Sequence, residues 1–158
     1  MTGMAEDSSS DVHSDDERTS AAVARFMAER DLFARHLGIR LEELRPGYSR
    51  TGLDLLPYMV NGLGMPHGAV IFALADFAFA AACNSYGRAA VALSMDIHFL
   101  SSPQPGGSLV CEAREVKHGN RTGLYHLTVS DGEGNQVAEL HGMAYRKGTR
   151  FLEDENEF

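Results

Sequence analysis

The chain has 158 residues, of which 44% are hydrophobic, so it is long enough to form one globular domain with a sizeable core. The net charge of −8 comes from the ends, because residues 1–18 hold six acidic residues and one arginine and residues 153–158 hold four more acids. Once these are taken from the totals of 14 basic and 22 acidic residues, residues 19–152 hold 13 and 12. This balance excludes the basic surface of a nucleic-acid-binding protein but permits a phosphorylated ligand.

The acidic composition of the two ends predicts disordered tails over residues 1–18 and 151–158, which flank a single domain over residues 19–150. No basic start is followed by an apolar core, as in a secretory signal, and no segment reaches the roughly 20 apolar residues of a membrane-spanning helix. Cys83 and Cys111 lack metal-site spacing and are expected to be reduced. We therefore expect a soluble, cytoplasmic protein without a membrane partner.

Apolar residues at helical spacing predict a helix that begins at Thr19 or Ser20 and ends near Gly38, with a restart at Asp31. Alternating polarity and turn formers predict the strands that follow. These expected strands are residues 39–45, 48–56, 91–99, 108–117, 122–130 and 136–146. The last four are joined by short turns, so they are expected to be antiparallel neighbours.

The strand expected at residues 91–99 alternates between apolar and polar positions. The odd-numbered residues from Val91 to Phe99 are apolar, and Ser94, Asp96 and His98 lie between them. Successive side chains of a strand point to opposite faces, so the apolar set is predicted to lie on one buried face.

Residues 69–83 form an alanine-rich apolar segment that is predicted to be a helix. Large apolar side chains occupy every face of this helix, so it is expected to be enclosed rather than to have a wet side. An antiparallel sheet that curls around one central helix accounts for the order of the elements. The predicted fold class is therefore α+β.

Asp76 is the one charged residue in this helix. An ionised carboxylate costs several kcal/mol in an apolar setting unless it is paired or partly wet. It either forms a structural pair with an arginine of the sheet or of a partner chain, or faces a cleft as a general base or nucleophile. Composition does not decide between these two alternatives.

The start of the helix offers backbone donors at Gly68, which suit a developing oxyanion, although a glycine there also serves as a simple turn residue. Asp76 lies eight residues further on, which is about 12 Å along the helix axis. One small carbonyl group cannot contact both groups in one chain. Two antiparallel helices across a two-fold axis would bring Asp76 of one chain to Gly68 of the other, so a dimer with composite sites is expected.

Several stretches resemble the hotdog-fold acyl-CoA thioesterases, in the branch named for phenylacetic acid degradation. They include HGAVIFALADFAFAAACN and LSMDIHFLSSPQPGG, and the similarity extends over about residues 31–147. The most specific part combines Asn61, the pair His67-Gly68 and Asp76 at fixed spacing. The family commonly has a second glycine after the histidine, where this chain has Ala69, but the amide of Gly68 is retained.

The resemblance implies a sheet wrapped around a long helix, a homodimer or homotetramer, and hydrolysis of an acyl-CoA, with an aryl acyl group suggested by the branch. It gives Asp76 the role of nucleophile or of base that activates water, and gives the Gly68 amide the role of polarising the thioester carbonyl. Asn61 would orient water or substrate and His67 would shape the helix start. Ser94 matches a serine that supports the acid in relatives, and it ranks second because of its place on the polar face.

No cofactor is expected, because coenzyme A is part of the substrate, and no metal site is expected, because the histidines are scattered along the sequence. Basic residues near the last strands, Arg114 and Arg121 first among them, would either meet the CoA phosphates or be ordinary solvated charges. Lys117, Arg146 and Lys147 are the other candidates. Two rival functions remain open: a non-catalytic acyl-CoA-binding or regulatory hotdog protein, and a purely structural oligomer.

Overall fold

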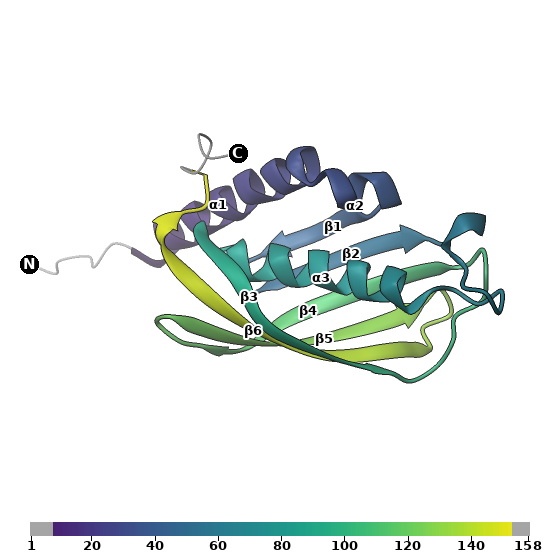
Figure 1. Cartoon of the computed structure of the whole chain (residues 1–158). Coiled ribbons are helices and arrows are strands. Elements are labelled where there is room, and N and C mark those ends of the chain that lie inside the picture. The colour runs from purple at the N-terminus through teal and green to yellow at the C-terminus, as the bar shows by residue number, and fades with distance from the viewer. Residues whose placement is uncertain (1–7, 153–158) are drawn as a thin grey trace, which may run out of the picture.

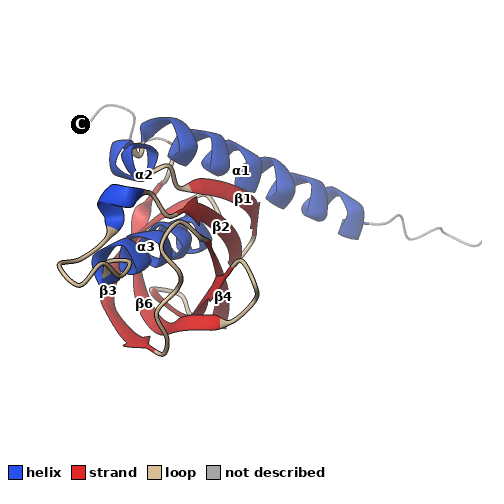
Figure 2. Cartoon of the chain, turned by 90° about the vertical axis from the view of Figure 1, so that its right-hand side faces the viewer, coloured by secondary structure: helices blue, strands red, loops and turns tan. Residues whose placement is uncertain are grey.

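The computed structural model describes residues 8–152 and consists of one antiparallel sheet curled around a helix (Figures 1 and 2). Its helices are α1 (Ser8–Arg30), α2 (Leu32–Leu37), the 3-10 turn η1 (Pro57–Met59) and α3 (Gly68–Asn84). Its strands are β1 (Arg40–Arg45), β2 (Tyr48–Asp54), β3 (Arg88–Phe99), β4 (Ser108–His118), β5 (Thr122–Asp131) and β6 (Gln136–Arg150). The predicted α+β class and the wrapped helix are confirmed.

The strands lie in the order β1-β2-β4-β5-β6-β3, and every neighbouring pair is antiparallel. The expectation that the last four strands are neighbours holds for β4, β5 and β6 but is wrong for β3, which pairs with β6. Residues 100–107 carry the chain from β3 across to β4, and β6 then returns to lie between β5 and β3. As a result β3 lies at one edge of the sheet.

Helix α3 packs most of its surface against the concave side of the sheet, where its buried residues form part of the core (Figure 2). Phe79 is 1% exposed, and its ring meets the ring of Tyr125 edge to face at 5.4 Å between centroids. A Cβ at Gly142 would lie 2.6 Å from the Phe79 ring, so only glycine allows β6 to approach the helix this closely. Cys83 and Cys111 are both free and buried in this core.

A β-bulge at Leu93 changes which residues of β3 face the helix. Ala92 pairs with the buried Ala144 and Ser94 pairs with Met143, so the register shifts by one residue between them. The single buried face expected for the odd-numbered residues is therefore wrong, because a bulge switches the side-chain alternation. Met95 and Ile97 pack against the core, whereas Leu93 is 58% exposed.

Helix α1 begins at Ser8, well before the expected start at Thr19 or Ser20. Part of the tail expected to be disordered is thus helical. The restart at Asp31 is confirmed: its side chain caps α2 by accepting from the Ala34 N–H at 2.9 Å, and Gly38 ends that helix with φ +79°. The remainder of the two predicted tails, residues 1–7 and 153–158, lies outside the described residues.

The helices within residues 8–152 include none with the length and hydrophobicity of a membrane span.

Candidate active site

One stripe of α3 is not covered by the sheet of its own chain. It comprises Ala69, Phe72, Ala73, Asp76 and Ala80, which recur at helical spacing and are exposed or half-buried. The expectation that the helix is enclosed on every face is therefore wrong for a single chain. The sheet curls around only part of the helix and leaves this face open.

Asp76 is the one charged group on this stripe, and it is exposed. No hydrogen bond or ion pair of Asp76 is found within residues 8–152, so the structural alternative of an arginine partner has no support in one chain. Loss of hydration among its apolar neighbours, followed by the negative charge of Asp31, raises the pKa of Asp76 above its ordinary value. A carboxylate with a raised pKa and a free approach is suited to accepting a proton.

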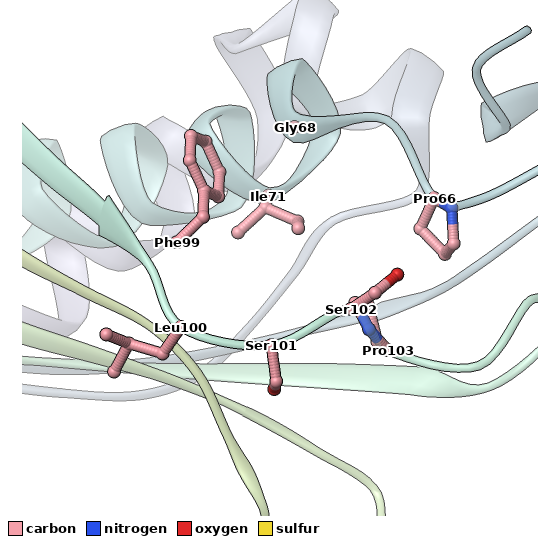
Figure 3. Close-up of a pocket in the computed structure, with 8 residues that line it drawn as sticks. All are labelled: Pro66, Gly68, Ile71, Phe99, Leu100, Ser101, Ser102 and Pro103. Carbon is pink, nitrogen blue, oxygen red and sulfur yellow. The ribbon is translucent and has the colours of Figure 1, made fainter. Parts of the chain in front are cut away.

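Gly68 is the first residue of α3, and its N–H donates to no atom in the described part of the chain. It lines a pocket of about 300 Å³ together with Pro66, Ile71 and residues 99–103 (Figure 3). A Cβ at this position would lie 3.1 Å from Cζ of Phe99, so glycine lets the ring approach the helix start. A free amide at a helix N-terminus beside a pocket can accept a carbonyl oxygen.

Two more predicted site residues shape the approach to α3. The Nδ1 atom of His67, the N-cap residue, accepts from the Ala69 N–H at 3.0 Å. The Oδ1 atom of Asn61 accepts from the N–H groups of Leu63 and Met65 at 2.9 and 3.2 Å and so folds the loop. Its Nδ2 group has no partner within residues 8–152, so the Asn61 amide has donors available for a ligand.

The remaining predicted site residues do not lie near this helix start in one chain. Ser94 is exposed and points to the outer face of the sheet, as its pairing with Met143 requires. Arg114 is also exposed on that sheet, where its Cζ atom lies 4.5 Å from the Tyr48 ring centroid. Arg121 lies in the β4–β5 turn, next to Asn120 in the sequence. The Asn120 carbonyl accepts a hydrogen bond from Arg88, which follows the C-terminal end of α3, so this turn lies at the end of the helix opposite to Gly68.

Arg146 is a structural residue rather than a surface cation. Its side chain is 3% exposed and forms an ion pair with Glu115, whose side chain is 10% exposed. Glu115 also accepts from the Tyr125 hydroxyl at 3.0 Å and from Tyr86. The expectation that Arg146 could meet CoA phosphates is therefore wrong, because its charge is buried and paired.

The histidines are less scattered in space than in sequence. His126 and His141 are cross-strand partners with ring centroids 5.0 Å apart, and the Nε2 atom of His126 lies 2.9 Å from Oε1 of Glu139. The ligand atoms of these three residues lie within 4.8 Å of one another, so they could hold a divalent metal ion. They alternate with buried residues that face α3, so this group lies on the outer face of the sheet.

Sequence reasoning missed Asp31 as a neighbour of Asp76, and it placed Phe99 on a buried face although that residue is 53% exposed beside Gly68. The contact of Phe99 follows from the strand order, and that of Asp31 from the packing of α1 and α2 near α3. No local pattern in the sequence carries either signal.

Known proteins share this architecture. The profile of the Thioesterase superfamily matches residues 63–138. The Escherichia coli acyl-coenzyme A thioesterase PaaI is 36% identical over 125 residues, which cover 79% of this chain and 89% of that protein. A putative esterase of Archaeoglobus fulgidus is 33% identical over 129 residues, covering 82% and 84%.

Solved structures agree with these sequence relatives. The structure of E. coli PaaI, from the phenylacetic acid degradation operon, has a TM-score of 0.82 and 34% identity, covering 84% of this chain and 96% of that one. A Streptococcus mutans protein bound to acetyl CoA has a TM-score of 0.68 and 26% identity, covering 72% and 91%. By its sequence, its wrapped helix and these relatives, the chain belongs to the thioesterase superfamily, in the PaaI-like branch of the hotdog fold.

Proposed function

We propose that this protein hydrolyses an acyl-CoA thioester to the free acid and CoA, as a homodimer with composite active sites. The observation that carries the proposal is that one otherwise apolar helix has both a carboxylate without a partner, that of Asp76, and a backbone N–H without a partner, that of Gly68. Their separation of about 12 Å along α3 prevents both from reaching one carbonyl within a chain. A two-fold axis supplies each group from a different subunit and produces two sites.

The open edge of the sheet supports this dimer. Strand β3 pairs with β6 along one edge, and its other edge has no partner strand among residues 8–152. The strand also carries exposed apolar residues. The exposed fractions are 44% for Val91, 58% for Leu93 and 53% for Phe99. An unpaired apolar edge strand is a template for a second copy of the sheet, and pairing there would bring the two open stripes of α3 together. Assembly of two such dimers into a tetramer is part of the same expectation.

In the proposed reaction the Gly68 N–H of one subunit donates to the thioester oxygen and stabilises the negative charge that develops on it. Asp76 of the other subunit acts in one of two ways. As a general base it takes a proton from water, whose oxygen forms the new C–O bond while the C–S bond breaks and CoA leaves as the thiol. As a nucleophile its carboxylate oxygen bonds to the acyl carbon while the C–S bond breaks and CoA leaves, and water then cleaves the resulting anhydride into the free acid and the Asp76 carboxylate. In a single turnover in labelled water the general-base route puts ¹⁸O only into the released acid, so ¹⁸O found in Asp76 would identify the anhydride route.

The first test measures thiol release from a panel of CoA esters. Asp76→Asn is expected to lower turnover by about a hundredfold or more, as for a lost acid–base group, while CoA esters still bind. Asp96→Asn is the matched control, because Asp96 is an exposed acid on the outer face of β3. If Asp76→Asn retains the wild-type rate, the catalytic assignment is wrong. If the wild type binds esters without releasing thiol, the protein is a binding or regulatory module.

The composite site has its own test by subunit mixing. Gly68→Pro removes the N–H at the first helical position, where proline is tolerated, and His67 already has a compatible backbone with φ −71° and ψ 133°. A heterodimer of Gly68→Pro and Asp76→Asn subunits retains one intact site. Random mixing of the two inactive variants should therefore restore about a quarter of the wild-type rate per dimer. No recovery from mixtures that have exchanged subunits would contradict sites shared between chains.

We propose that the acyl group of the substrate is aryl, as in the phenylacetic acid branch. The hydrolysis is expected to need no cofactor. The one cluster of potential metal ligands described above lies on the outer face of the sheet, away from Asp76. We therefore propose that a chelator leaves thiol release unchanged. The free, buried thiols of Cys83 and Cys111 accord with a cytoplasmic location.

A further inference from the structure

Two histidines and a glutamate gather on the outer face of the sheet, where β5 and β6 lie side by side (Figure 1). His126 of β5 lies directly opposite His141 of β6, and Glu139 precedes His141 by two residues on the same strand. Residues two apart on a strand point to the same face, and directly opposite residues are the nearest cross-strand neighbours. The antiparallel register therefore brings one side chain from β5 and two from β6 to the same place.

The geometry of this group fits the ligands of a metal ion. One ligand atom from each of the three side chains lies within 4.8 Å of the others, and the two imidazole rings are 5.0 Å apart between centroids. Ligands that each bind an ion at about 2.0–2.2 Å are separated by no more than about twice that distance, so small rotations of the side chains would complete the site. The side chains of His126 and Glu139 are 37% and 39% exposed, so an ion can enter from solvent.

The charges around the group favour a cation. The group itself brings one carboxylate, and Asp96 of β3, the cross-strand partner of His141, adds a second one on the same face. The chain has another contact between a histidine and a carboxylate, that of His118 with Glu115, but there the guanidinium of Arg146 contacts both side chains. Because like charges repel, a metal ion is disfavoured beside Arg146 and favoured in the group on β5 and β6.

We propose that His126, Glu139 and His141 bind one divalent transition-metal ion of the Zn²⁺ type, which joins β5 to β6 on the side of the sheet opposite to α3. Imidazole nitrogens suit Zn²⁺, Ni²⁺ and Cu²⁺, whereas Mg²⁺ and Ca²⁺ prefer ligand sets made of oxygen atoms. The two histidines therefore discriminate against Mg²⁺ and Ca²⁺. Three protein ligands leave a further position on the ion for water.

The proposed ion would stabilise the fold without taking part in the hydrolysis. On the inner face of the same two strands, the ring of Phe79 packs against Tyr125 and approaches Gly142 closely. An ion that joins β5 to β6 would therefore fix the part of the sheet that supports the middle of α3. Asp76 lies on the stripe of α3 that this sheet does not cover, so thiol release should continue when the ion is removed.

The test adds Zn²⁺ to the full chain after treatment with a chelator. Calorimetry should show one Zn²⁺ bound per subunit. Zinc at 100 times its dissociation constant should raise the melting temperature by about 5–10 °C, and Mg²⁺ should not raise it. His141→Ala, Glu139→Gln and His126→Gln each remove one ligand and should weaken zinc binding by at least about tenfold, the smallest effect of losing even an outer-shell partner. His126→Gln retains an amide that can donate to Glu139, so the contact between the strands is kept.

Two other exposed histidines provide matched controls. His98→Ala removes the histidine of β3 that lies opposite Glu139 on the same face, and His36→Ala removes a histidine of α2. Both should keep the wild-type zinc affinity. A wild type that binds no zinc, or a folded His141→Ala variant with wild-type affinity, would overturn the site. Equal losses in His98→Ala and His141→Ala would do the same, because they would indicate diffuse binding to a histidine-rich surface. Thiol release that stops without zinc and returns with it would contradict a purely stabilising ion.

Discussion

The proposed dimer can be tested at Leu93, the extra residue of the β-bulge on the open edge of the sheet. Its side chain is 58% exposed in a single chain. Full burial of a leucine side chain stabilises a structure by about 1.5–3 kcal/mol, so covering the exposed part of Leu93 would stabilise the dimer by about 1–1.7 kcal/mol. A two-fold axis counts each residue twice, which gives about 2–3.5 kcal/mol for the dimer.

Leu93→Asp forfeits this contribution and adds the cost of burying a charge, so the dimer dissociation constant should rise at least 30- to 300-fold, at about 1.4 kcal/mol per factor of ten. Sedimentation velocity over a concentration series measures this change, and thiol release should fall with the dimer fraction. Val116→Asp is the matched control, because Val116 is 59% exposed and is also the extra residue of a bulge, but lies on the inner strand β4. An unchanged dimer for Leu93→Asp, or an active monomer, would refute edge-to-edge assembly.

Three further predictions follow from charges near the helix and in the core. Because the pKa of Asp76 is raised, hydrolysis should be lost on acidification at a higher pH than the ordinary pKa of an aspartate would give. Asp31→Asn removes a negative charge that raises this pKa but keeps the cap on α2, so it should move the acid limb of the pH–rate profile to lower pH. Because the folded state favours the protonated form of Asp76, Asp76→Asn should raise the melting temperature at pH 7, and the gain should vanish below about pH 4, as calorimetry can follow. Glu115→Gln leaves Arg146 buried and unpaired, so it should cost about 3–5 kcal/mol and lower the melting temperature by on the order of 10 °C at pH 7. Despite its burial, hydrogen bonds from Tyr86, His118 and Tyr125 hold the pKa of Glu115 below its ordinary value, so this stability is lost as the pH falls through that lowered pKa, and an unchanged gap between Glu115→Gln and wild type at acid pH would contradict it.

The parts of the fold that follow local patterns were predictable from the sequence. The alanine-rich run gave α3 to within one residue at each end, and the caps at Asp31 and Gly38 gave α2. The hairpins through β4, β5 and β6 followed from alternation and turn formers. Each of these features depends on residues close together in the sequence, so periodicity and turn chemistry are sufficient.

The features that were not predictable depend on distant contacts. The pairing of β3 with β6 joins two strands that are separated in the sequence by β4 and β5, and no turn formula encodes it. The bulge at Leu93 moves the apolar residues of β3 between faces, but a single inserted residue has no signature in the alternating pattern. The nearness of Asp31 to Asp76 depends on how α1 and α2 pack beside α3.

The position of Asp76 connects the stability of the fold with its proposed chemistry. A charge facing the sheet would lie within the core, whereas a charge on the uncovered stripe keeps part of its hydration until a second subunit and a substrate arrive. The apolar residues around it favour burial instead, because covering Phe72, Ala73 and Ala80 with a partner stabilises the assembly. Assembly would therefore bury the stripe and dehydrate the carboxylate together, which raises the pKa of Asp76 further. The same contact that completes the site would thus make its acid a stronger base.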